Sequence, residues 1–259
     1  MENTKTNIVI FCDGTWDDPA EETNVYRLFK LLGPSSEEKL VHKKGKAQKI
    51  RKRSGKDRNH KYVKGVSGMF NSFVAADLPA IIKYVYKVIV KRYNNEANKS
   101  KLKEIWLFGF SRGAYTTRCV AGIIQFCGIL KYDNDGLIDC AYELYHNKSP
   151  SYGPDGHEPT KFRESYSHSY DPAIKNYPNH KPYIPNIKFL GLWDTVGDYG
   201  IPAFEMGEGF EFLNFFDLHV FDTVINAYQI LSIHENFALY KSCRIFRKRN
   251  LLGTKLKEV

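Results

Sequence analysis

Three short, mostly apolar runs, each ended by a polar residue, constrain the fold of this chain more than any other feature. The runs cover residues 7–12, 105–110 and 187–193, and the residues that follow them are Asp13, Ser111 and Asp194. A continuous apolar run of this length, closed by a turn residue, is typical of a strand that is buried on both faces. We therefore expect three buried strands, each with a polar side chain at its carboxyl end.

Segments with helical spacing of apolar residues lie between and around these runs. They predict helices over residues 24–32, 75–93, 113–126, 140–145 and 222–238. Strands that alternate with helices favour an α/β fold with a mostly parallel sheet and helices on both faces. Because ligands bind at the carboxyl ends of the strands in such sheets, Asp13, Ser111 and Asp194 are expected to border one site.

The chain is interpreted as a single α/β domain, residues 1–259, with two departures from the alternating pattern. Residues 42–64 read as a basic loop insertion. Residues 147–185 are rich in Pro, Tyr, His, Ser and Asn and show little periodicity. We interpret this second stretch as an irregular, cap-like excursion over the sheet.

The positive charge of the chain is concentrated in the basic loop insertion. The formal net charge is +9, and residues 42–64 hold eleven Lys or Arg against the single acid Asp57, so the rest is close to neutral. A solvated loop is the simplest interpretation, and peripheral contact with an anionic membrane is the more specific hypothesis. Tyr62, near the end of the run, is its one Phe, Tyr or Trp residue. This is not the aromatic interleaving that base stacking needs, so no specific nucleic acid is expected as a partner.

Cysteine usage and hydropathy restrict the remaining classes. The five cysteines are scattered without a CxxC pair, which argues against a disulfide framework and against a zinc site. We expect no metal and no cofactor. The sequence shows no signal peptide and no apolar run near the ~20 residues of a spanning helix, which predicts a cytoplasmic protein, at most membrane-peripheral. It does not define the oligomeric state.

Residues 109–113 (GFSRG) carry the GxSxG pattern of a serine nucleophile. In this pattern the serine lies on a strained strand-to-helix turn, where a side chain at Gly109 or Gly113 would collide with the neighbouring strand or helix. The turn exposes the hydroxyl of Ser111, which makes it the candidate nucleophile. The alternative is an ordinary strand-to-helix turn in which Ser111 caps the helix.

A nucleophilic serine of this kind needs backbone N–H groups as an oxyanion hole. Arg112 supplies one by its position directly after the serine. The loop of Asp13, Gly14 and Thr15 is the candidate for the second, since Gly14 permits a close approach of the backbone. Asp13 could instead orient a water or hold this loop in shape.

Asp194 is the candidate acid that would orient a catalytic histidine and stabilise its charged form. Its alternative role is to cap the turn that follows its strand. Only His219 and His234 follow Asp194 in the chain, and His234 on the expected helix 222–238 is the preferred base. A histidine on a helix more often has a surface or packing role, and without a base within about 3 Å the hydroxyl of Ser111 is a poor nucleophile.

Five stretches in this order resemble the α/β-hydrolase family of the catalytic domains of bacterial type VI secretion phospholipase effectors, and its fungal members in particular. They are FCDGTW (11–16), NVYRL (24–28), LFGFSRGAY (107–115), FLGLWDTVG (189–197) and AYQILSIHE (227–235). The resemblance implies an α/β-hydrolase-like fold and phospholipase or esterase activity without a metal. It also implies that Ser111 is the nucleophile and Asp194 the acid.

The chain departs from the family pattern in two places. Many members have a His at the position of Gln229, and members continue to a segment with the His of the triad, whereas this chain ends at Val259. Three interpretations remain open: an active hydrolase with an unusual base such as His234, a C-terminally incomplete part of a longer lipid hydrolase, or an inactive relative that binds a lipid or a protein.

Overall fold

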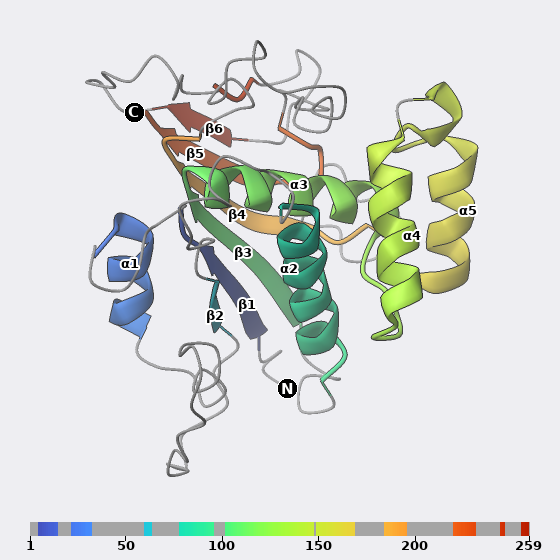
Figure 1. Ribbon diagram of the computed structural model, residues 1–259, viewed down its shortest axis with the longest axis horizontal. Coiled ribbons are helices and arrows are strands. Elements are labelled where there is room, and N and C mark those ends of the chain that lie inside the picture. The colour runs from blue at the N-terminus through green and yellow to red at the C-terminus, as the bar shows by residue number, and fades with distance from the viewer. Residues whose placement is uncertain are drawn as a thin grey trace.

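A parallel β-sheet is the centre of the fold in the computed structural model (Figure 1). The structure describes residues 5–14, 22–32, 60–63, 78–95, 102–147, 149–168, 184–195, 220–231, 244–246 and 255–258. Within these ranges six strands pair in the order β2-β1-β3-β4-β5-β6, and every pair is parallel. The strands are β1 (Lys5–Cys12), β2 (His60–Val63), β3 (Leu102–Phe110), β4 (Ile187–Trp193), β5 (Asn226–Ile230) and β6 (Lys255–Glu258).

The order of the strands reverses between β1 and β3. The chain passes from β1 outward to the edge strand β2, returns to β3 on the other side of β1, and then adds β4, β5 and β6 in sequence. At this reversal Cys12 is level with Gly109, and Phe110 is level with Trp193. The carboxyl ends of β1, β3 and β4 therefore lie side by side at the position where open α/β sheets bind their ligands.

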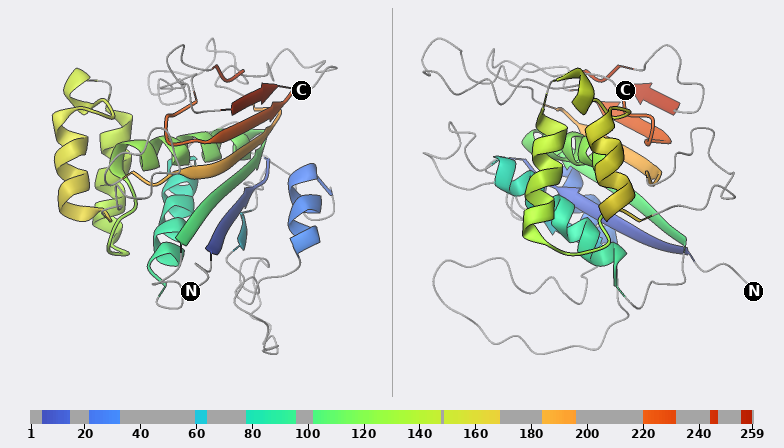
Figure 2. Two further views of the ribbon diagram at one scale, coloured as in Figure 1. Left: turned by 180° about the vertical axis from the view of Figure 1, so that it is seen from behind. Right: turned by 90° about the vertical axis from the view of Figure 1, so that its right-hand side faces the viewer.

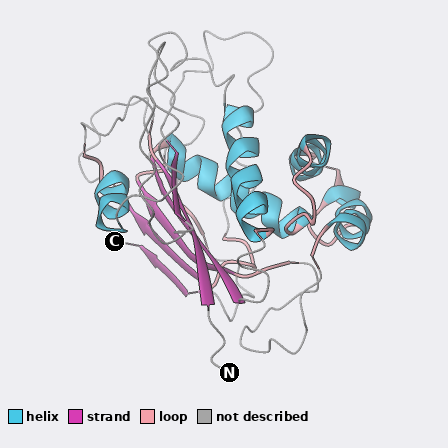
Figure 3. Cartoon of the chain, turned by 90° about the horizontal axis from the view of Figure 1, so that it is seen from below, coloured by secondary structure: helices cyan, strands magenta, loops and turns pink. Residues whose placement is uncertain are grey.

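Helices cover both faces of the sheet (Figure 3). Helices α2 (Leu78–Tyr93) and α3 (Arg112–Cys127) lie on one face, and α1 (Asn24–Leu32) lies on the other. On the α1 side, the ring of Phe29 packs edge-on against Phe11 of β1, which stacks on Phe108 of β3. The expected α/β fold with a parallel sheet is confirmed.

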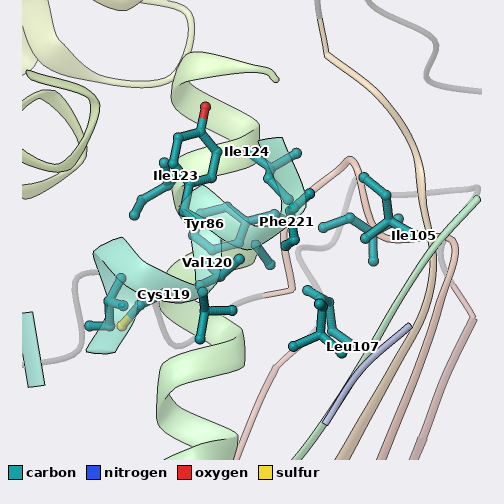
Figure 4. Packing of buried hydrophobic residues seen from close by; sticks show 14 of the residues in the cluster. Tyr86, Ile105, Leu107, Cys119, Val120, Ile123, Ile124 and Phe221 are labelled. Carbon is teal, nitrogen blue, oxygen red and sulfur yellow. The ribbon is translucent and has the colours of Figure 1, made fainter. Parts of the chain in front are cut away.

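Helix α3 is buried almost along its whole length because the sheet, α2 and two further helices surround it. Its side chains Val120, Ile123 and Ile124 meet Ile105 and Leu107 of β3 in the main hydrophobic core (Figure 4). Burying aliphatic side chains of this size contributes about 1.5–3 kcal/mol each. The core thus holds the second half of α3 against the middle of β3.

Helices α4 (Asp135–His146) and α5 (His157–Tyr166) lie side by side and pack against the C-terminal end of α3 (Figure 2). The guanidinium of Arg163 is buried and donates from Nη1 to the carbonyl oxygens of Phe126 at 2.5 Å and Pro154 at 2.7 Å. These bonds satisfy a carbonyl in the last turn of α3, which has no partner within its own helix. They join the end of α3 to the α5 segment.

Several expectations for the secondary structure need correction. The expected helix 222–238 is wrong over residues 226–230, which form β5, and its residues from 232 on lie outside the described residues. Residues 255–258, for which the sequence predicts no element, form β6, and the last residues of the basic insertion contain β2. Within the excursion 147–185, which was expected to be irregular, residues 157–166 form α5.

The physical reason for the error at β5 is the burial pattern. Ala227 and Gln229 are buried, whereas Tyr228 and Ile230 are exposed. This alternation has the period of a strand with one buried face. The sequence hides this alternation, because the apolar residues before and after the short strand in the chain also recur at helical spacing.

Candidate active site

Ser111 occupies a strained turn between β3 and α3. Its backbone has φ 54° and ψ −122°, in the half of conformational space that residues other than glycine rarely adopt. Such a conformation costs on the order of 1–3 kcal/mol and persists only where the surroundings enforce it. Ser111 occupies the N-cap position of α3, but its half-buried side chain makes no capping hydrogen bond to the helix.

Two glycines allow this turn. A Cβ atom on Gly109 would lie 2.5 Å from the carbonyl oxygen of Gly113, inside the first turn of α3. A Cβ atom on Gly113 would run into the carbonyl oxygen of Cys12 and lie 2.6 Å from that of Asp13. Both contacts are with backbone, which cannot rotate away. Any larger residue at either position would push α3 away from the ends of β1 and β3.

Asp194 lies at the same edge of the sheet, one residue beyond the neighbouring strand β4. It has a positive φ of 42°, like Ser111. The Ser111 N–H donates to the carbonyl oxygen of Trp193 at 2.9 Å, and the Asp194 N–H donates to that of Ile230 at 2.8 Å. The parallel ladder thus continues to both residues. It places Ser111 and Asp194 on adjacent strand ends rather than on opposite edges.

Asp13 borders Ser111 on the other side, at the end of β1. The residue is 3% exposed. Its Oδ1 accepts the Gly14 N–H at 3.0 Å, and its Oδ2 accepts the Thr23 hydroxyl at 2.7 Å. The Gly14 N–H is therefore engaged with the Asp13 carboxylate and does not point to a ligand in this structure. Thr15, the third residue of the expected oxyanion loop, lies outside the described residues.

Arg112 begins α3, next to Ser111. The first N–H groups of a helix have no partner in their own helix, and they carry the positive end of its dipole. Negative charge that develops beside Ser111 would be stabilised at this helix end.

Gln229 is a buried polar residue that sequence reasoning noted only as a departure from the family. It is 1% exposed. Its Oε1 accepts the Ile245 N–H at 2.8 Å, and its Nε2 donates to the Thr195 hydroxyl at 3.4 Å. The amide therefore holds the residue that follows Asp194. The available signal was an amide in an otherwise apolar run, but only the pairing of β5 shows that it points inward.

The base expected from the sequence is not placed, because His219 and His234 both lie outside the described residues. Among the described histidines, His168 binds Asn94 through Nε2 at 2.6 Å, and its ring packs on Tyr93 at the end of α2. Lys103, at the start of β3, lies over the same Tyr93 ring. His168 is therefore at the amino end of the strands, far from Ser111.

Cys12, beside Asp13, is not a competing nucleophile. Burial, and after it the neighbouring Asp13 charge, raises the pKa of the Cys12 thiol well above its usual value. The thiol therefore stays protonated at neutral pH, and a buried thiol in apolar surroundings is inert.

The described part of the chain lacks two features, a metal site and a membrane-spanning helix. No group of three or more His, Cys, Asp or Glu side chains there could hold a metal ion. No helix among those residues has the length and apolar character needed to cross a membrane.

The parallel sheet with a strand reversal and the tight serine turn at its carboxyl edge define an α/β protein of hydrolase-like type. The model of the type VI secretion phospholipase effector Tle1-like catalytic domain matches residues 6–259. The chain belongs to this family, as its motifs indicated.

Other comparisons add a distant relative. An uncharacterized protein of Saccharomyces cerevisiae is 26% identical over 204 residues, which is 75% of this chain and 27% of that protein. The chain thus spans about a quarter of the length of the relative that it matches. No solved structure shows a significant match to the chain.

Proposed function

We propose that this protein is a serine hydrolase that cleaves carboxylic esters of lipids, with Ser111 as the nucleophile. The observation that carries the proposal is the strained Ser111 turn, which two close-packed glycines stabilise at the carboxyl edge of the sheet. A protein stores strain of this kind where a side chain must be presented in a defined direction. Membership in a phospholipase catalytic-domain family supports a lipid substrate.

In the proposed reaction, Ser111 Oγ attacks the ester carbonyl carbon while a base takes the hydroxyl proton. The carbonyl oxygen becomes an oxyanion, which the Arg112 N–H at the start of α3 stabilises. The intermediate then collapses, the alcohol leaves with the proton from the base, and the acyl group stays on Ser111 as an ester. A water, deprotonated by the same base, hydrolyses this ester and releases the fatty acid.

His234 is our candidate for the base, and Asp194 would orient its imidazole. The position of Asp194 on the strand end next to Ser111 supports this role, because an imidazole bridges a nucleophile and an acid that lie on neighbouring strand ends. We expect His234→Ala and Asp194→Asn to reduce turnover strongly, as Ser111→Ala does. His219→Ala is the matched control and is expected to retain activity.

Peripheral contact with an anionic membrane through residues 42–64 would bring the protein to such a substrate. Since β2 begins at His60, the test should spare the strand and replace only the basic residues from 43 to 58 by Gln. We expect weaker sedimentation with phosphatidylserine vesicles and unchanged hydrolysis of a water-soluble ester. Unchanged sedimentation would contradict the membrane role.

A fluorophosphonate probe tests the nucleophile directly, because it reacts covalently with activated serines. We expect labelling of the purified chain, mapped by mass spectrometry to Ser111, and loss of labelling in Ser111→Ala. The matched control is Ser165→Ala, which removes an exposed serine hydroxyl on α5, remote from the site. Hydrolysis of phosphatidylcholine vesicles should follow the same pattern.

The alternative is a relative without catalysis that binds a lipid or a protein. The engagement of the Gly14 N–H by Asp13 favours it, since this donor is then not free for an oxyanion. Absence of labelling and of hydrolysis, together with vesicle binding that Ser111→Ala leaves intact, would refute the hydrolase and support this alternative.

A further inference from the structure

A partly buried chain of hydrogen bonds joins the end of β1 to the beginning of α1. The Asp13 carboxylate accepts the Gly14 N–H and the Thr23 hydroxyl, and the Thr23 Oγ1 itself accepts the Tyr26 N–H at 3.1 Å. The Thr23 carbonyl oxygen also accepts the Arg27 N–H at 2.8 Å. Burying a carboxylate is costly unless its oxygens are hydrogen-bonded, and here each oxygen has a donor. We call Asp13 and Thr23, joined by the hydrogen bond from the Thr23 hydroxyl to Asp13 Oδ2, the Asp13–Thr23 pair.

The backbone of Asp13 lies in direct contact with the turn that carries Ser111. The Cα of Gly113 sits so close to the carbonyl oxygens of Cys12 and Asp13 that a Cβ would not fit between them. A change in the backbone at Asp13 is therefore transmitted to the first turn of α3. On the other side of Ser111, Gln229 holds the turn after β4 in a comparable way.

Asp13 does not present its carboxylate to a substrate. Its two oxygens face Gly14 and Thr23, and the side chain is buried. These contacts bring together both ends of the segment 14–23, which leaves the sheet edge next to Ser111. The role that fits this geometry is control of the shape of the site rather than chemistry on the substrate.

We propose that Asp13 is a positioning residue: held by the Thr23 hydroxyl, its carboxylate fixes the turn after β1 against the Ser111 turn and so defines one wall of the site. The inference rests on the proposed hydrolase function for its kinetic consequence. Misplacement by about 1 Å of a group that aligns a reaction can reduce the rate about 100-fold. The hydroxyl of Thr23 is thus expected to matter for a reaction that it does not touch.

Thr23→Val and Thr23→Ser form a matched pair for the test. Valine keeps the shape of threonine but leaves Asp13 Oδ2 without its donor, whereas serine keeps the hydroxyl. We expect Thr23→Val to lower kcat for p-nitrophenyl butyrate and the rate of fluorophosphonate labelling about 10–100-fold, with KM changed less than about 2-fold. Thr23→Ser should stay within about 3-fold of the wild type.

Two further variants separate the pair from a general effect on α1. Asp13→Asn should also lower kcat, because the single amide oxygen of Asn cannot accept from both Gly14 and Thr23. The double variant Asp13→Asn/Thr23→Val should lose less activity than the product of the two single effects, because both changes weaken the same hydrogen-bonded group. Glu22→Gln, at the residue next to Thr23, breaks an exposed ion pair with Lys30 in the last turn of α1 and should leave kcat unchanged.

Hydrogen exchange of the native protein provides a readout that needs no activity. Thr23→Val and Asp13→Asn should accelerate exchange at Tyr26 and at the amides of residues 113–115, and Thr23→Ser and Glu22→Gln should not. Wild-type exchange at residues 113–115 in Thr23→Val would overturn the inference. If the wild type neither hydrolyses esters nor is labelled, the proposed hydrolase function fails. Hydrogen exchange still tests whether the Asp13–Thr23 pair positions the Ser111 turn.

Discussion

The strain at Ser111 leads to a quantitative prediction about stability. Replacing Ser111 by Gly or by Ala removes the hydroxyl in both cases, but only Gly relieves the cost of φ 54° and ψ −122°. That cost is on the order of 1–3 kcal/mol. Against it stands the larger conformational entropy of Gly in the unfolded chain, about 0.5–1 kcal/mol. The net expectation is that Ser111→Gly is more stable than Ser111→Ala by about 1 kcal/mol.

For a chain of this size, 1 kcal/mol corresponds to a shift of about 2–4 °C in the midpoint of thermal unfolding. Differential scanning calorimetry of the two variants at one pH measures it. Ser165 on α5 is the matched control, since its backbone is helical. Ser165→Gly should be less stable than Ser165→Ala by about 1 kcal/mol, so the order of the Gly and Ala variants is the reverse of that at Ser111.

The comparison has a clear negative outcome. If Ser111→Gly unfolds at or below the temperature of Ser111→Ala, the turn is not strained, and the structural argument for a presented nucleophile fails. If the order at Ser111 is opposite to that at Ser165, the strain is real and local. The calorimetric comparison needs no substrate, because it measures only unfolding.

Three further predictions concern the surroundings of the site and the opposite end of the sheet. Gly113→Ala should destabilise the fold by about 3 kcal/mol in urea unfolding and abolish labelling of Ser111, because the new methyl group meets the carbonyl oxygen of Cys12. If the variant is as stable as the wild type, this close packing is contradicted. Gln229→Leu should cost about 1–3 kcal/mol, since it leaves the buried Ile245 N–H without its acceptor, whereas a neutral effect would show that this bond is dispensable. Burial lowers the pKa of His168 below the ordinary value of 6.5, so the folded state favours the neutral ring. The contribution of the neutral His168 to stability is therefore present above pH 6.5 and is lost as the pH falls through the lowered pKa. His168→Gln should therefore make the unfolding midpoint depend less on pH in that window, and an unchanged dependence would refute the assignment.

Local patterns in the sequence were sufficient for the elements that need no distant partner to be recognised. Strands β1, β3 and β4 were predicted because their apolar runs are continuous, and α1 was predicted with its observed bounds because its apolar face has helical spacing. The GxSxG pattern indicated the turn at Ser111, and the need for Gly109 is local because a Cβ there would meet Gly113 four residues on. The need for Gly113 comes from the backbone of Cys12 and Asp13, which only the tertiary structure brings next to it. The family resemblance rested on such local motifs as well.

Tertiary structure decided what depends on residues far apart in the chain. The segments of β2 and β6 (HKYV and KLKE) are strands because each pairs with one neighbour, β1 or β5, and their sequences alone do not favour that state. β5 is a strand because it pairs with β4 and β6, and its side chains then alternate between a buried and an exposed face of the sheet. The partners of Asp13 and Gln229 were likewise not predictable, because a buried polar atom is satisfied by whichever donor or acceptor the packing brings near it.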